Sequence, residues 1–291
     1  THMLNEGGGI ETDLTVVCIN KNHFRIISSA AVRTHDKAHI LKHLSNSVEF
    51  KDVTDDLICL GIFGPKSREL LSKLTNENLS NENFKFGTSR SLNFGSIKVW
   101  TQRLSYVGEL GYELYIESNN VKKIYDLIVT SGKDFGLTHC GAHTMDTMRM
   151  ESGFLHWGHD ISPEENQYQA GLNFAISYKK PFDFIGKEKL LEIKNQKIDR
   201  RFVMLTLKES IPGKPLLLHE EPIYLEDEII GKTTSGNYSF NYNKNLSFGY
   251  IKSDLSNELL SMKNLYIEVE KQKYQAQLIT KPLKESAFKN I

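Results

Sequence analysis

The stretch Ser105–Ile116, SYVGELGYELYI, combines two closely spaced glycines with alternating apolar and polar residues. Such alternation is typical of a half-buried β-strand, because successive side chains of a strand point to opposite faces of a sheet. Alternate residues from Tyr112 to Ile116 would share one face, whereas Glu113 and Tyr115 would lie on the other. We therefore predict a tight glycine connection that leads directly into a strand.

Glu113 has two interpretations in such a strand. A charged carboxylate that is buried without a partner costs roughly several kcal/mol, so an inward-facing Glu113 needs a hydrogen-bond donor, which a ligand could supply. Alternatively, Glu113 lies on the solvent face of an edge strand, as a lone glutamate most often does. The residues of the strand leave both interpretations open.

The same stretch matches a family signature. The matching residues are Tyr106-x-Gly108-Glu109-x-Gly111-x-Glu113. The pattern resembles the aminomethyltransferase family, which includes the glycine-cleavage T-protein and the folate-binding C-terminal parts of dimethylglycine and sarcosine dehydrogenases. Further segments resemble this family in the same order along the chain: Gly7–Asp13, Met148–Gly153, Trp157–Asp160, Ala170–Phe174 and Asp183–Lys187. The resemblance extends over nearly the whole chain.

The resemblance implies a fold and a site. The expected fold class is α+β, with ferredoxin-like folate-binding aminomethyltransferase layers followed by a small antiparallel C-terminal β-barrel. The resemblance also implies that Tyr106 and Glu113 bind the pterin ring of tetrahydrofolate, and that Asp13 is the catalytic carboxylate near the folate nitrogen. A nearby anion would stabilise a cationic iminium and accept a proton. From the residues alone, Asp13 could instead cap a β-hairpin by accepting backbone N–H bonds.

Two positions depart from the family pattern. Met145 stands where the T-proteins carry an arginine that contacts folate, whereas the dehydrogenase branch tolerates an apolar residue there. Gln169 replaces the usual glutamate, which keeps the hydrogen-bonding shape but removes the charge. Met145 therefore weakens an assignment to the T-proteins themselves, and Gln169 puts an ionic role at its position in doubt.

The composition of the 291 residues argues against several classes of protein. Lysine plus arginine and aspartate plus glutamate both number 36, so net charge favours neither nucleic acid nor an anionic membrane as a partner. The apolar runs are shorter than a membrane span. The 3 cysteines, Cys18, Cys59 and Cys140, are widely spaced, and we expect reduced, mostly buried thiols in a cytoplasmic protein.

The pattern predicts an amphipathic helix over Arg33–Leu44, with Ala38, Leu41 and Leu44 on its apolar face. His35, His39 and His43 fall on one side of this helix. A zinc site would need further ligands nearby, and no second cluster in the sequence clearly supplies them. We therefore interpret the histidines as a solvated face or as a contact between elements, and we expect no metal.

The order of the predicted elements favours two domains. Strand pairs, including Val48–Val53 and Leu57–Phe63, alternate with helices up to about residue 196, and this alternation favours α+β layers. From there on only short strands follow, and this pattern favours a small antiparallel barrel or sandwich. Thr234–Gly236 resembles a turn that is typical of the family's C-terminal barrel. We predict an aminomethyltransferase folate-binding domain over residues 1–196 and a C-terminal β-barrel domain over residues 197–291. We also expect the chain to be a fragment that lacks the N-terminal part of the first domain.

These observations predict a transferase that moves a one-carbon unit, aminomethyl or methylene, from an oxidised methylamine such as dimethylglycine or sarcosine to tetrahydrofolate. The expected partners are folate, the methylamine-derived substrate and an FAD-dependent dehydrogenase domain or subunit, which would carry the FAD outside this chain. Three alternatives remain open. They are a non-catalytic folate-binding module of a larger FAD-dependent dehydrogenase, a degenerate interaction or repair protein, and a sulfonium demethylase acting on dimethylsulfoniopropionate.

Overall fold

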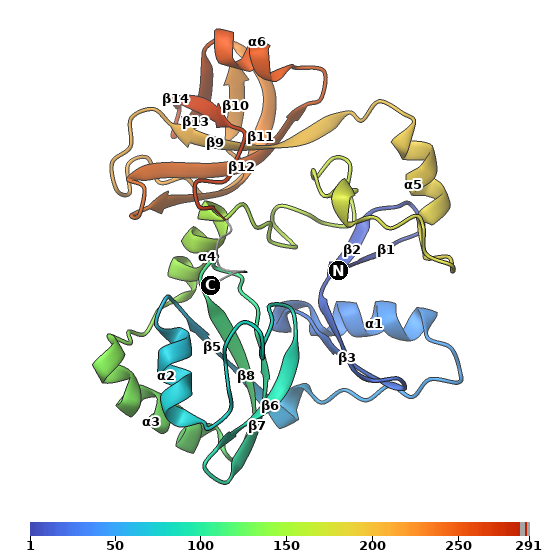
Figure 1. The fold of residues 1–291 in the computed structure, drawn as a ribbon. Coiled ribbons are helices and arrows are strands. Elements are labelled where there is room, and N and C mark those ends of the chain that lie inside the picture. The colour runs from blue at the N-terminus through green and yellow to red at the C-terminus, as the bar shows by residue number, and fades with distance from the viewer. Residues whose placement is uncertain (286–288, 290–291) are drawn as a thin grey trace. The chain divides into compact units, whose positions relative to one another are not determined.

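The chain forms two compact units in the computed structural model, which describes residues 1–285 and 289 (Figure 1). The first unit comprises residues 1–44 and 153–283, and the second comprises residues 45–152 with the described residues from 284 onward. Each unit has hydrophobic core of its own. The candidate functional residues are therefore held by two separate frameworks.

A four-stranded antiparallel sheet lies at the centre of the second unit. Its strands in spatial order are β5 (Leu57–Phe63), β8 (Gly111–Glu117), β7 (Ile97–Gln102) and β6 (Ser89–Phe94). The helices of this unit are α2 (Ser67–Leu74), α3 (Val121–Gly132) and α4 (Ala142–Glu151). The predicted strand at Leu57–Phe63 is confirmed, whereas the one at Val48–Val53 is wrong, because that segment pairs with no strand in the described part of the chain.

The register of β8 against its neighbours separates an apolar face of this sheet from a polar one. Tyr112, Leu114 and Ile116 are fully buried, and they pack in one core with residues of α2 and α3. Glu113 and Tyr115 point to the opposite face, because successive residues of a strand alternate. The two faces predicted for this stretch are confirmed.

The C-terminal β-barrel predicted from the sequence is confirmed as a closed antiparallel barrel. Its strands, in order around the barrel, are β10 (Pro222–Leu225), β11 (Glu228–Ser239), β12 (Lys244–Lys252), β9 (Arg200–Leu207), β14 (Gln272–Ile279) and β13 (Leu265–Val269). Helix α6 (Asn257–Met262) lies against β14. Buried aliphatic side chains such as Leu205, Ile223 and Ile267 fill the interior. Together with the layered sheet of the second unit, the barrel confirms the predicted fold class.

The rest of the first unit contains two β-hairpins and two helices. They are β1 (His2–Leu4) with β2 (Ile10–Asp13), β3 (Thr15–Asn20) with β4 (His23–Ile27), α1 (Arg33–His43) and α5 (Lys187–Lys194). Leu4 and Ile10 of the first hairpin pack with Ile161 and Leu190 in a small core of their own. This core fixes the hairpin that carries Asp13.

The predicted apolar face of α1 is wrong. Ala38 is exposed, Leu41 is 46% exposed and Leu44 is half-buried, whereas the buried residue of this helix is Asp36. His35 and His39 lie on the half-buried side of the helix. A hydrogen-bonded carboxylate and histidines thus replace aliphatic packing on the side of α1 that meets the unit.

The cysteines are free, but the prediction that they are mostly buried is wrong, because all three are exposed. Cys18 lies in the exposed β3–β4 hairpin, Cys59 on the polar face of the sheet and Cys140 just before α4. The apolar character of cysteine therefore does not predict burial at these three positions.

The domain boundary predicted between residues 196 and 197 lies within the first unit, between α5 and β9. That separate domains meet there stays a prediction.

No helix in the described residues is long and apolar enough to cross a membrane. A cytoplasmic location also stays a prediction.

The turn before β8 requires glycine at position 108, because Gly108 has a φ of +66° and a Cβ there would lie 1.9 Å from Ser152 Oγ. Gly95, in the β6–β7 turn, has a similar φ of +61° but open space around it. We expect Gly108→Ala to lower the free energy of unfolding by about 2–4 kcal/mol and Gly95→Ala by about 1 kcal/mol. Urea denaturation measures both losses, and equal losses would contradict the proposed clash.

Candidate functional site

Glu113 lies half-buried on the polar face of the sheet in the second unit. Its Oε2 accepts a hydrogen bond from the Tyr115 hydroxyl at 2.5 Å, and this hydroxyl accepts one from Gln102 Nε2 at 3.1 Å. Burial raises the pKa of the Glu113 carboxyl, although the Tyr115 hydroxyl opposes this shift by stabilising the charged form. Because β8 is a central strand, Glu113 is not the solvated glutamate of an edge strand.

Phe63 forms an aromatic surface beside Glu113. Across the β5–β8 pairing, Phe63 lies opposite Gly111, and Gly61 lies opposite Glu113. A Cβ would come within 2.4 Å of the Phe63 ring on Gly61 and within 2.3 Å on Gly111. Glycine at both positions therefore lets the ring lie against the sheet. An aromatic ring next to a half-buried carboxylate suits a flat ligand that donates hydrogen bonds.

Tyr106 lies half-buried in the loop that joins β7 to β8. Ser105 Oγ orders this loop by accepting the backbone N–H of Glu109 at 3.2 Å. Tyr106 and Glu113 thus belong to one turn-and-strand segment of the second unit, whereas Asp13 belongs to the first unit. The structure brings the two predicted pterin-binding residues into one unit.

Asp13 ends β2, and 39% of its side chain is exposed. His2 lies opposite across the β1–β2 pairing, with Nε2 at 3.8 Å from Asp13 Oδ1. Burial lowers the pKa of His2, and this effect outweighs the nearby carboxylate of Asp13, which raises it. The neutral form of the ring is therefore favoured. In residues 1–285 and 289 no backbone N–H donates to the Asp13 carboxylate, so this side chain does not cap the hairpin. The amino group of Thr1 also lies 3.8 Å from Oδ1, and the partly exposed carboxylate stays accessible to solvent.

Loops from later in the chain fix the position of β2. Trp157 Nε1 donates to the carbonyl of Ile10 at 2.9 Å, and the N–H of Ile10 donates to the carbonyl of Glu165 at 2.8 Å. A Cβ on Gly9 would lie 1.9 Å from the carbonyl oxygen of Pro163. The glycine run before Asp13 therefore permits a backbone-to-backbone approach that no other residue allows.

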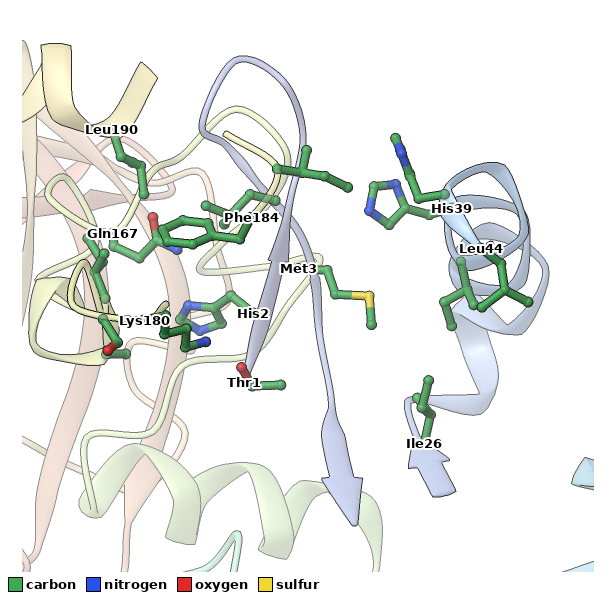
Figure 2. Close-up of a pocket in the computed structure, with 17 residues that line it drawn as sticks. Thr1, His2, Met3, Ile26, His39, Leu44, Gln167, Lys180, Phe184 and Leu190 are labelled. Atoms are coloured by element: carbon green, nitrogen blue, oxygen red, sulfur yellow. The ribbon is translucent and has the colours of Figure 1, made fainter. Parts of the chain in front are cut away.

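A cavity of about 410 Å³ with a mainly apolar lining lies beside β1 in the first unit (Figure 2). Leu4, Phe184 and Leu190 supply part of the apolar lining, and His2 and Lys180 supply polar groups. His2, which lines the cavity, also approaches Asp13, which does not line it itself. Sequence reasoning missed this cavity, because segments far apart in the chain line it.

His35 connects α1 to β2. Its Nε2 lies 3.0 Å from Glu11 Oε1, and its Nδ1 lies 3.0 Å from Asp36 Oδ1. The hydrogen bond with Asp36 raises the pKa of His35, although burial opposes the shift. The ring also packs 5.2 Å from that of Trp157. His35 thus joins elements, and no group of 3 or more metal-ligating side chains is found within the described residues.

Asp160 anchors the Trp-Gly-His-Asp turn to the barrel. Its Oδ1 accepts the hydroxyls of Thr234 at 2.5 Å and Ser235 at 2.8 Å, and its Oδ2 accepts the N–H of His156 at 2.9 Å. The side chain is only 1% exposed. Strand β11 shifts register at these hydroxyls, so the turn predicted over Thr234–Gly236 is wrong and a bulge in a continuous strand takes its place. The bulge directs two donors at one buried carboxylate.

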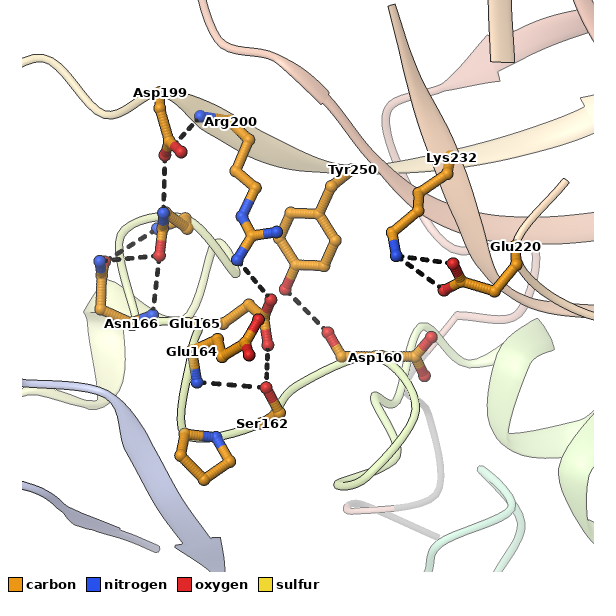
Figure 3. A network of polar contacts seen from close by, with 12 residues as sticks. Asp160, Ser162, Glu164, Glu165, Asn166, Asp199, Arg200, Glu220, Lys232 and Tyr250 are labelled. Carbon is orange, nitrogen blue, oxygen red and sulfur yellow. Dashed lines mark hydrogen bonds and ion pairs between the residues drawn. The ribbon is translucent and has the colours of Figure 1, made fainter. Parts of the chain in front are cut away.

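The structure explains the amide at position 169 through its bonds to Asn166 and Asp199, which Figure 3 labels. Gln169 Oε1 accepts the backbone N–H and the side-chain amide of Asn166, at 3.0 and 2.8 Å, while Nε2 donates to Asp199 Oδ1 at 2.7 Å. Burial raises the pKa of Asp199, but the bonds from Gln169 and the Arg200 N–H outweigh burial and hold this pKa below its usual range. An ionised glutamate could not donate to Asp199. The other departing residue, Met145, is 44% exposed on α4.

The sequence did not reveal Gln102, Tyr115 or Phe63 as parts of the site. Gln102 lies directly opposite Glu113 in the β7–β8 pairing. The alternation of apolar and polar residues in the two strands could have placed Gln102 on the polar face. That Gln102 lies opposite Glu113, however, depends on the register of the two strands, which the turn between them sets.

Two family models match the chain: the GCVT N-terminal domain over residues 1–180 and the glycine cleavage T-protein C-terminal barrel domain over residues 200–284. The chain is 35% identical over 286 residues to mitochondrial dimethylglycine dehydrogenase of Homo sapiens, covering 97% of this chain and 32% of that protein. It is 30% identical over 254 residues to the aminomethyltransferase of Halothermothrix orenii, covering 87% of this chain and 69% of that protein.

The crystal structure of glycine cleavage system aminomethyltransferase T from Bartonella henselae has a TM-score of 0.82 and 19% sequence identity to the chain. The match covers 98% of this chain and 75% of that one, and it supports the fold. The chain spans about a third of the length of the dehydrogenase relatives, as the 32% coverage of the human protein shows.

Gln169→Glu should destabilise the protein by about 2 kcal/mol at neutral pH, because a carboxylate would replace the donor to Asp199. The loss should shrink as pH falls, because the paired carboxylates have a raised pKa and protonation restores a donor. Gln196→Glu, at an exposed position after α5, is the matched control and should be neutral. Urea denaturation at pH 7 and pH 5 tests this, and equal stability of the two variants at pH 7 would contradict it.

Proposed function

Since the chain belongs to the glycine cleavage T-protein (aminomethyltransferase) family, we propose that it binds tetrahydrofolate and transfers a one-carbon unit to it from an oxidised methylamine. The observation that carries this proposal is the half-buried Glu113 carboxylate on the polar face of the sheet. Its Oε2 is engaged by Tyr115, and no donor in the described residues reaches its Oε1. This oxygen and the adjoining Phe63 ring fit the N–H edge and the flat face of a pterin.

Asp13 would act at the reacting atoms. Its partly exposed carboxylate carries no backbone hydrogen bond within the described residues, so it can stabilise the positive charge of an iminium. It can also take the proton that the attacking nitrogen releases. Tetrahydrofolate, when bound, supplies the amine nitrogens that accept the carbon. In the balanced reaction the iminium carbon leaves its amine, the amine keeps one proton from folate, and a second proton is released.

Dimethylglycine or sarcosine, oxidised by an FAD-dependent domain or subunit, would supply the iminium. The similarity to dimethylglycine dehydrogenase, of which the chain covers 32%, supports this donor class.

The same coverage favours a second candidate, a folate-binding module without catalysis within a longer dehydrogenase. Saturable folate binding without transfer would identify that module. A sulfonium demethylase would act on dimethylsulfoniopropionate and not on amines. A degenerate interaction or repair protein would show neither activity and would not bind folate.

Glu113→Gln should weaken tetrahydrofolate binding at least 100-fold, because it removes the charge that a buried donor edge requires. Glu117→Gln, at the exposed end of the same strand, is the matched control and should bind as the unchanged protein does. Isothermal titration calorimetry of residues 1–291 with tetrahydrofolate measures both. Equal affinities of the two variants would contradict the proposed site.

Asp13→Asn should abolish transfer while changing the Kd for tetrahydrofolate less than about threefold, because the amide can neither stabilise an iminium nor take a proton. Formation of methylene-tetrahydrofolate is measured with dimethylglycine and a separate flavin-dependent amine-oxidising enzyme. Asp254→Asn, in an exposed turn after β12, serves as the control. Unchanged turnover of Asp13→Asn would remove Asp13 from the mechanism.

A further inference from the structure

The hydroxyl of Tyr115 holds the Glu113 carboxylate in one orientation. It donates to Oε2 at 2.5 Å and accepts from Gln102 Nε2 at 3.1 Å, which directs its proton to the carboxylate. The thiol of Cys59, opposite Tyr115 on β5, also faces Tyr115 and Glu113, and burial raises its pKa, so it stays neutral. Burial and the charge of Glu113 raise the pKa of Tyr115, which keeps the hydroxyl protonated and donating. The direction of this hydrogen bond is therefore fixed.

The ring of Tyr115 is itself immobilised. It is 7% exposed, and its centroid lies 4.7 Å from that of Trp100, its neighbour on β7. Gln102 is 3% exposed and is held by the strand directly opposite Glu113. Both supporting side chains thus lie on paired central strands of the sheet, where backbone hydrogen bonds limit movement.

We propose that Tyr115 and Gln102 are positioning residues for Glu113. They orient its carboxylate and favour its charged form, so that Oε1 faces the donor edge of the ligand. This inference rests on the proposed tetrahydrofolate site. A buried carboxylate without this support would rotate and would take up a proton more readily, and both changes weaken a charge-assisted hydrogen bond. The Tyr115 hydroxyl reaches the ligand only through Glu113.

The direct test is the titration of the Glu113 carboxyl by carbon-13 NMR, with Glu113→Gln identifying its resonance. Tyr115→Phe should move the titration midpoint to higher pH, because it removes a donor that stabilises the charged form. Tyr112→Phe is the matched control, since Tyr112 lies on the opposite face and its hydroxyl accepts from Arg68 Nε at 3.3 Å. A midpoint in Tyr115→Phe equal to that of the control would overturn the inference.

Gln102→Leu provides a second variant if Tyr115→Phe fails to fold. It leaves the Tyr115 hydroxyl in place but removes the amide that directs it, so the midpoint should move in the same direction by a smaller amount. A merely structural role would lower the unfolding free energy without moving this midpoint. An unchanged midpoint in a folded Gln102→Leu would remove Gln102 from the proposal.

The ligand readout uses tetrahydrofolate with residues 1–291. Tyr115→Phe should weaken binding about tenfold at pH 7, as expected for loss of a hydrogen bond to a charged group. The loss of affinity on acidification should also begin at higher pH than in the unchanged protein. Equal affinity and an equal pH profile would overturn the inference and leave the proposed function standing. Absence of binding by the unchanged protein would overturn the proposed function, while the carboxyl titration would still decide the inference.

Discussion

The antiparallel pairing of β8 with β5 and β7 is the constraint on which both the core and the candidate site of the second unit depend. A slip by one residue would send Tyr112 and Leu114 to the polar face and press Glu113 into the aliphatic core. Each fully buried large apolar side chain contributes about 1.5–3 kcal/mol, so the apolar face fixes the register firmly. The position of the carboxylate is thus a consequence of packing on the other side of the sheet, and it requires no strain of its own.

Much of this architecture could be predicted from local periodicity, because alternation and helical spacing are properties of short segments. The strand Leu57–Phe63 and the two faces of the strand that carries Glu113 were predictable in this way, whereas the closed C-terminal barrel was implied by the family resemblance. Val48–Val53 has residues suited to a strand but finds no partner in the described chain, and local preference cannot supply one. The bond from Gln102 to Tyr115 requires the register of two strands, which no single segment specifies.

Polar residues that conflict with a sequence pattern find partners elsewhere in their unit. Asp36 occupies the buried side of α1 because His35 bonds it, and His35 in turn bonds Glu11 of β2. Gln169 can donate to Asp199 only because it is an amide. The contact of His35 with Glu11 and that of Gln169 with Asp199 join residues far apart in the sequence, so the reason for these unusual residues becomes visible only in three dimensions. Asp36 and Gln169 therefore have structural roles, although their residue types alone would suggest a catalytic or binding role.

The contact of Phe63 with Gly61 and Gly111 restricts the order in which these positions can change during evolution. While the ring lies against the sheet, a side chain at either glycine would overlap it. A smaller residue at position 63 would leave space, and only then could an alanine follow at position 61 without displacing an aromatic group. Positions 61 and 63 should therefore vary together among descendants of this protein, with the aromatic residue lost first, whereas Gly111 stays restricted by the carbonyl oxygen of Leu104, which lies 2.8 Å from the place of a Cβ. A lineage that passed through both steps could regain phenylalanine only after restoring the glycine at position 61.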